Sequence, residues 1–237
     1  MGKLVAYSGF SATNYLEMPY NSDLDFGTGD FCVMGWAFLS GTPSGVIIRR
    51  RKADNTGARW DLGTLSGVPY FALFDGSNLV TADGSTSFTG WVHVVGVSRG
   101  TDVEIYVNSA LQESTTRSIV GSVDGATPTV IIGNHQGGTS PFNGSLALLR
   151  ISATAPTADQ IAKIYNDEKV LFQENAQATL YGASDAVTAL AHDPDTDLLH
   201  VGTSAGRSVF RGLERLSNTT TSVSTAISAT GGLVISK

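Results

Sequence analysis

Cysteine is nearly absent from this chain, which has only Cys32 among its 237 residues. A single cysteine excludes an internal disulfide and any metal site built from several thiolates. Cys32 lies in the apolar run 31–39, which favours an inert thiol in the protein core. No motif indicates a bound cofactor, and we expect none.

Long apolar runs are also missing. No stretch approaches the roughly 20 consecutive apolar residues that a membrane-spanning helix needs. The first residues, 1–5, lack the apolar segment and small-residue cleavage site of a secretory signal peptide. We therefore expect synthesis in a cytoplasm without classical export and no membrane insertion. Work outside the cell would then require release by lysis or assembly into a particle.

Charge is sparse, since charged residues make up 15% of the chain and the formal net charge is −6. A nucleic-acid-binding surface needs concentrated basic charge, so we expect no nucleic-acid partner. Glycine is plentiful instead, with 27 residues. Such a composition is typical of many short strands joined by tight turns.

Alternating apolar segments recur from residue 13 to residue 152. In one of them Val103, Ile105 and Val107 alternate with more polar residues, which is the period-two pattern of a half-buried strand. Asp75-Gly76 and similar pairs supply the positive-φ positions of hairpin turns. The predicted strands are 13–18, 31–39, 46–51, 58–62, 69–75, 91–98, 103–108, 129–133 and 145–152.

One helix is predicted after these strands. Thr157 can cap it, with Gln160 as the capping-box partner three residues later. Its apolar face is formed by Ile161, Ile164 and Tyr165, at i, i+3 and i+4. We expect the helix to end near Phe172 and a polar linker to follow at 173–177.

The amino-acid composition of the chain changes after this linker. Short strands are predicted at 186–192, 198–202, 207–212 and 233–236, separated by Ser-, Thr- and Asp-rich segments. So few strands have little core of their own. We therefore divide the chain into a β-sandwich over 1–172 and a C-terminal β segment over 173–237 that serves oligomerisation or anchoring.

Four motifs occur in an order that resembles a known family. The segment LDFGTGDF at 24–31, leading to Trp36, is similar to the first long strand of laminin G-like, or concanavalin A-like, domains. GWVHV at 90–94 and VEIYVN at 103–108 resemble two further strands of that family. FNG at 142–144, followed by LRI and the predicted helix, resembles its closing segment.

The resemblance implies an all-β fold: an antiparallel jelly-roll β-sandwich with one short helix, extended here by the C-terminal β appendage. It also implies binding of glycans or proteins. A laminin G-like module with a Ser/Thr-rich β tail and no signal peptide is similar to bacteriophage fibre, spike and decoration proteins. Residues 187–203 also look like part of one β-propeller blade, which cannot close a ring by itself.

Ligand-binding candidates lie in the loop 133–138, where Asn134, His135 and Gln136 stand between glycines. Pentraxin-like relatives carry acidic residues in the matching loop and bind calcium there. Because calcium needs several carboxylate oxygens and this loop has none, we expect no metal in it. Asp23, Asp25 and Asp30 are close in sequence, but their spacing also suits a solvated turn.

Two further candidates come from the strands. Arg49 and Arg51 would share one strand face and could contact an acidic glycan. The alternative is a solvated strand end that discourages edge aggregation. Trp60, between Arg59 and Asp61, is the best candidate for an exposed aromatic ring that stacks on a sugar, but a half-buried strand favours its packing in the core.

The run 31–39 is apolar on both faces, although a sandwich strand normally shows one face to water. This predicts a cover, either the C-terminal segment or a neighbouring subunit, and we favour a homo-oligomer, a trimer above all. No motif selects a catalytic carboxylate pair, so we expect no enzyme. The favoured function is a virion structural protein that contacts other virion proteins and possible host surface glycans; the alternative is a free carbohydrate-binding, lectin-like module of a bacterial surface system.

Overall fold

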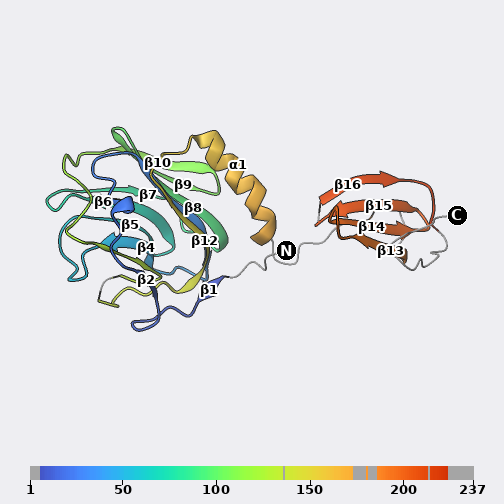
Figure 1. The fold of residues 1–237 in the computed structure, drawn as a ribbon, viewed down its shortest axis with the longest axis horizontal. Coiled ribbons are helices and arrows are strands. Elements are labelled where there is room, and N and C mark those ends of the chain that lie inside the picture. Colours follow the sequence, from blue (N-terminus) through green and yellow to red (C-terminus); the bar gives the residue numbers. More distant parts are fainter. Residues whose placement is uncertain (1–5, 136, 173–179, 181–185, 213, 224–237) are drawn as a thin grey trace. The chain divides into compact units, whose positions relative to one another are not determined.

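A computed structural model describes residues 6–135, 137–172, 180, 186–212 and 214–223. The chain divides into two compact units, Met1–Phe172 and Gln173–Lys237. The first unit is a sandwich of two six-stranded antiparallel sheets (Figure 1). The predicted antiparallel β-sandwich of jelly-roll type, with one short helix, is thereby confirmed.

The first sheet has its longest strands at its centre. Strands β3 and β8 pair along nine residues, and β12 pairs with the other side of β3. In spatial order the strands are β1 (Tyr7–Ser8), β12 (Gly144–Ser152), β3 (Phe31–Leu39), β8 (Gly90–Arg99), β9 (Asp102–Val107) and β10 (Ala110–Thr116).

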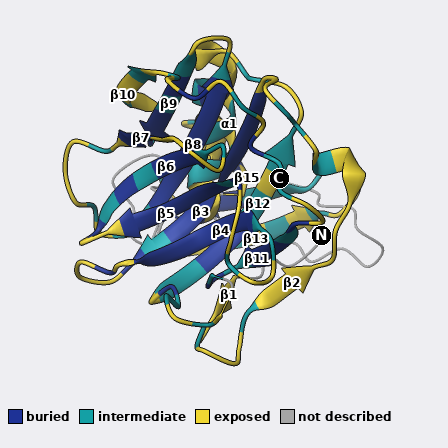
Figure 2. Cartoon of the chain, turned by 90° about the vertical axis from the view of Figure 1, so that its left-hand side faces the viewer, coloured by how far each residue is buried: buried dark blue, intermediate teal, exposed yellow. Residues whose placement is uncertain are grey.

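The second sheet packs against the inner face of the first. A short 3-10 helix, η1 (Ser22–Leu24), lies between the two N-terminal strands and β3 in the sequence. The spatial order of the strands is β2 (Leu16–Met18), β11 (Thr129–Ile132), β4 (Gly45–Arg51), β5 (Arg59–Leu65), β6 (Val68–Phe74) and β7 (Leu79–Asp83). Figure 2 shows that burial is concentrated in the central strands and that the edge strand β2 is exposed.

The core between the sheets follows from the period-two pattern. Alternate residues of facing strands, among them Phe31, Trp60 and Phe71, are fully buried in one apolar cluster. Gly96 on β8 gives the Phe71 ring its space, because a Cβ at Gly96 would lie 2.4 Å from ring atoms. The core is therefore matched in shape as well as in hydrophobicity.

The outer face of the first sheet is covered by the helix α1 (Ala158–Glu168) and the 3-10 turn η2 (Lys169–Phe172). The predicted capping box is present: the Gln160 backbone N–H donates to Thr157 Oγ1 at 3.3 Å, and the Thr157 N–H donates to the Gln160 side chain at 2.8 Å. Phe172 stacks on Trp36 with ring centroids 4.2 Å apart. Both faces of β3 are apolar, and the cover that we expected from the C-terminal segment or from another subunit is supplied instead by α1 and η2.

A buried ion cluster ties β4 to two distant loops. Arg50 has a side chain that is 1% exposed; it pairs with Asp25 and, at 2.6 Å, with Asp124. Asp124 in turn accepts the backbone N–H of Phe26 at 3.2 Å. Asp30 lies elsewhere and accepts the Gly100 N–H at 2.7 Å. Asp25 and Asp30 thus stabilise different loops and do not form one acidic cluster.

The second unit contains a four-stranded antiparallel meander among its described residues. Its strands are β13 (Val187–Asp193), β14 (Leu198–Thr203), β15 (Gly206–Arg211) and β16 (Glu214–Thr219). The first three match the predicted strands closely, whereas β16 was not predicted. The predicted linker at 173–177 and the predicted strand at 233–236 lie outside the described residues.

Candidate functional site: a groove on the outer face of the second sheet

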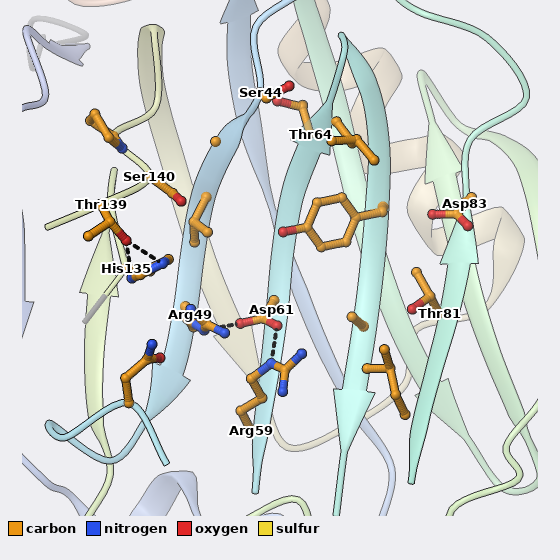
Figure 3. Close-up of a pocket in the computed structure, with 18 residues that line it drawn as sticks. Ser44, Arg49, Arg59, Asp61, Thr64, Thr81, Asp83, His135, Thr139 and Ser140 are labelled. Carbon is orange, nitrogen blue, oxygen red and sulfur yellow. Dashed lines mark hydrogen bonds and ion pairs between the residues drawn. The ribbon is translucent and has the colours of Figure 1, made fainter. Parts of the chain in front are cut away.

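The outer face of β4, β5, β6 and β7 is hollowed into a groove of about 750 Å³, which we name the sheet groove. It is lined by these four strands, by Ser44 just before β4, by Asn55 in the loop between β4 and β5, and by residues 135 and 139–141 (Figure 3). A small residue, Ala72 on β6, is part of the lining. It lies directly opposite Asp61 on β5, and its short side chain leaves space between the larger side chains around it.

Strand register sets which side chains meet across the groove. Arg49 on β4 pairs with Asp61 on β5, which pairs with Ala72 on β6. Ala72 pairs in turn with Thr81 on β7. Side chains directly opposite each other on neighbouring strands lie on the same face, so these residues form one row across the groove.

Asp61 sits between two arginines at one end of that row. Its carboxylate forms ion pairs with Nε of Arg49 and, at 2.6 Å, with Nε of Arg59 (Figure 3). The three side chains are 8%, 17% and 5% exposed for Arg49, Arg59 and Asp61. Burial lowers the pKa of Arg49, and the Asp61 charge opposes this shift. The groove floor therefore holds two guanidinium groups and one carboxylate.

Tyr70 adds an aromatic ring to the lining. A Cβ at Gly63 would lie 2.8 Å from the Tyr70 hydroxyl, so the absence of a side chain at Gly63 lets the ring lie against β5. Burial, followed by the negative charge of Asp61, raises the pKa of Tyr70 to about 12. Tyr70 is thus a neutral, half-buried ring in the groove at physiological pH.

The two rims of the groove are polar. Thr81 and Asp83 of β7 form one rim, and His135, Thr139 and Ser140 form the opposite one (Figure 3). Burial and then the charge of Glu113 raise the pKa of Asp83. His135 Nε2 lies 2.8 Å from Thr139 Oγ1. Hydroxyl, imidazole and carboxylate groups therefore surround the hollow with both donors and acceptors.

Asn134 builds the loop that carries His135. It is fully buried and donates from Nδ2 to the Ser11 carbonyl at 2.8 Å. Its Oδ1 accepts the backbone N–H of His135 at 2.8 Å and that of Ser140 at 3.1 Å. Because the side chain is buried and both of its polar atoms are hydrogen-bonded within the protein, the ligand contact expected of Asn134 is replaced by a structural role.

Of the other predicted site residues, some line the sheet groove and others do not. Arg49 and His135 line the sheet groove. Arg51 lies beyond the lining, half-buried, and donates to Asn55 at 2.8 Å, so a free solvated strand end is wrong for this arginine run. Gln136 lies outside the described residues.

Of the two alternatives for Trp60, packing in the core is confirmed, and a role as an exposed, sugar-stacking ring is wrong. Trp60 is 0% exposed and belongs to the central core. Its neighbours Arg59 and Asp61 point the other way, into the groove. The signal was available in the sequence: alternation over Arg-Trp-Asp-Leu-Gly places Trp60 and Leu62 on one face and the charged residues on the other. The same alternation predicts that Arg59 and Asp61 lie together on the outer face of the sheet.

Other kinds of site have less support in this part of the structure. The described residues contain no group of three or more His, Cys, Asp or Glu side chains placed to hold a metal ion. The described helices are all too short or too polar to cross a membrane. Of the two groove carboxylates, Asp61 is engaged by two arginines, and Asp83 lies two strands away from it. The arrangement is suited to binding a polar ligand.

Comparison with known proteins agrees with this architecture. Residues 10–162 match the family model of the concanavalin A-like lectin/glucanases superfamily. A search of curated proteins found no match to the chain.

Several solved structures share the fold at low sequence identity. The carbohydrate-binding module CBM40 of a Ruminococcus gnavus sialidase, bound to α2,3-sialyllactose, has a TM-score of 0.52 and 14% identity over 69% of this chain and 100% of that one. The receptor-binding domain of botulinum neurotoxin mosaic serotype C/D has a TM-score of 0.55 and 13% identity over 87% of this chain. Our chain spans 56% of that toxin chain. The native heptameric SAP-like pentraxin of Limulus polyphemus has a TM-score of 0.50 and 17% identity, with 66% of this chain and 79% of that one covered.

Proposed function

Because the chain belongs to the concanavalin A-like lectin/glucanase superfamily, we propose that its first unit is a non-enzymatic, lectin-like module that binds glycan in the sheet groove. The observation that carries the proposal is the groove itself. A hollow of about 750 Å³ on an outer sheet face combines the Tyr70 ring with hydroxyl and charged side chains. Such a mixture of an apolar ring and converging polar groups is what a sugar-binding site requires.

The known binding activity of proteins with this fold also supports the proposal. The sialidase module with this fold is bound to α2,3-sialyllactose in its solved structure. A glycan ligand suits the groove, since both rims, with Thr81 on one and Ser140 on the other, present hydroxyl groups that can hydrogen-bond to sugar hydroxyls.

A glycan array probed with the full chain tests the proposal. We expect binding to a defined set of oligosaccharides and its loss, by about tenfold or more, in Tyr70→Ala, because ring stacking and hydrogen-bond geometry are both removed. Tyr7→Ala is the matched control, since Tyr7 is a 55% exposed tyrosine on β1, outside the groove. Equal loss in both variants, or no binding to any glycan, would contradict the proposal.

We place this module in a virion, as a bacteriophage fibre, spike or decoration subunit that contacts other virion proteins. The support is the organisation of the chain: a lectin-like sandwich is joined to a small second β unit in a protein with a single, buried cysteine. Mass spectrometry of purified particles tests the setting. Peptides of this protein should be present at a constant ratio to capsid peptides after density-gradient purification.

The second candidate is a free, lectin-like module of a bacterial surface system. It is favoured by the match to the sialidase module, which this chain covers over its entire length. The protein would then appear in particle-free fractions and on cell surfaces. In either setting, incubation with polysaccharides should release no new reducing ends, and their release would overturn the non-enzymatic assignment.

A further inference from the structure

We infer that the sheet groove selects glycans that carry a carboxylate, such as uronic or sialic acids, and that Arg49 and Arg59 bind this group. The inference rests on the proposed function and names the ligand class for the same groove. It follows from three features of the described residues. These are the charge balance at the groove floor, the geometry of the arginines, and the difference in charge between the floor and the β7 rim.

The charge balance at the floor is positive. Arg49 and Arg59 share the single carboxylate of Asp61. Arg51 lies nearby and has a lowered pKa, caused first by burial and then by the positive charges of Arg59 and Arg49. At the groove floor itself, two guanidinium groups thus share one carboxylate, in a chain whose net charge is −6; the charge of Arg51 is partly offset by Asp61 and Asp54. A buried excess of positive charge is stabilised by an incoming anion.

The geometry leaves the fork of each arginine available. Both arginines approach Asp61 through Nε. Within the described residues, the terminal Nη atoms of Arg49 and Arg59 make no hydrogen bond to another group. These paired Nη groups are the donors that bind a carboxylate in a planar, bidentate manner.

The arginines are also held in place before any ligand arrives. The Arg59 guanidinium lies 5.0 Å from the centroid of the Phe74 ring, and its Nε is anchored on Asp61. Little side-chain entropy therefore remains to be lost on binding. Because the side chains are largely buried, the charge–charge attraction is screened less than on an open surface.

The acidic residues at the β7 rim of the groove determine the orientation of the ligand. Asp83 on β7 repels anions, and so does Glu113, whose carboxylate accepts the Asp83 backbone N–H at 2.6 Å. An acidic sugar is therefore expected with its carboxylate toward β4 and β5 and its hydroxyl groups toward β7. A highly sulfated chain, which carries anionic groups along its whole length, fits this polarity poorly.

Matched ligand pairs test the inference with the full chain. Isothermal titration compares oligogalacturonate with its methyl ester, and 3′-sialyllactose with its methyl ester; the members of each pair differ only at the carboxylate. We expect at least one acidic member to bind about tenfold or more tightly than its neutral partner, in line with a hydrogen-bonded ion pair. Arg59→Gln should remove this preference, and increasing NaCl should weaken acidic binding.

The control variant is Lys163→Gln, which changes the net charge equally at a 75% exposed side chain on α1; it should leave the preference intact. Equal binding of neutral and acidic members, or binding of sulfated sugars alone, overturns the carboxylate inference and leaves the glycan-binding proposal standing. Failure to bind any sugar, with the thermal transition intact, overturns both. A loss of preference in Lys163→Gln equal to that in Arg59→Gln also overturns the inference.

Discussion

At the scale of single residues, His93 makes stability depend on pH. Its ring is fully buried beside Trp36, and neither ring nitrogen has a hydrogen-bond partner in the described structure. Burial lowers its pKa from 6.5 to about 4; Glu168 opposes the shift and Arg150 adds to it. The unfolded chain therefore takes up a proton as the pH falls through 6.5, while the folded chain resists it until about 4.

Folding stability should accordingly decrease across this window, and the decrease should be smaller in His93→Phe. From about pH 7 to about pH 4.5 we expect the wild-type chain to lose roughly 2 kcal/mol more than the variant. Urea unfolding at the two pH values measures the difference. Identical losses would show that the His93 ring is protonated as easily in the folded chain as in the unfolded one.

A second prediction at the scale of single residues concerns the contribution of Arg50 to folding stability. Its guanidinium is the cation of a buried cluster with Asp25 and Asp124. Arg50→Met keeps the length of the side chain but leaves both carboxylates without that cation, at an expected cost of about 3–5 kcal/mol. Lys163→Met is the control, because its exposed pair with Asp167 is worth less than about 1 kcal/mol. Equal urea midpoints for the two variants would contradict the assigned role of Arg50.

At the scale of elements, α1 depends on its N-terminal cap. Thr157→Ala removes the acceptor for the Gln160 N–H and should cost about 1 kcal/mol, whereas Thr157→Ser should cost much less. Because α1 and η2 cover Trp36, early loosening of the helix should also change tryptophan fluorescence before the main unfolding transition. A Thr157→Ala chain as stable as Thr157→Ser would show that packing alone holds the helix.

Periodicity made most elements of the sandwich predictable. The strand at 31–39 and the capped helix were predicted from residue spacing, which depends only on neighbours along the chain. The sheet groove was not predicted, because it depends on register: Arg49 meets Asp61 only through the pairing of β4 with β5. Trp60 stayed open between an exposed ring and core packing, because its charged neighbours favour the surface while alternation favours the core, and the core alternative is confirmed. The cover of β3 was missed for a similar reason, since sequence shows an apolar face and not what packs on it.

At the scale of the whole molecule, the outer face of β3 no longer supports the predicted oligomer, but the exposed apolar side chains of the second unit still do. The sandwich covers the outer face of β3 with its own α1. The second unit buries few apolar side chains among its described residues, namely Val201, Val209 and Phe210, and exposes others such as Leu190 at 66%. A small sheet with exposed apolar side chains is stabilised by burying them against a partner.

We therefore expect the second unit to mediate self-association, as a trimer, and the sandwich alone to be monomeric. Light scattering coupled to size exclusion should give three times the chain mass for the full protein and one chain mass for a truncated protein of residues 1–172. Leu190→Ser should weaken the full-length oligomer, whereas Leu65→Ser, at a 67% exposed leucine of the sandwich, should not. A monomeric full chain would remove the oligomerisation role from the second unit. A trimer that survives truncation would place the interface on the sandwich, where a shared surface could present several sheet grooves to one multivalent glycan.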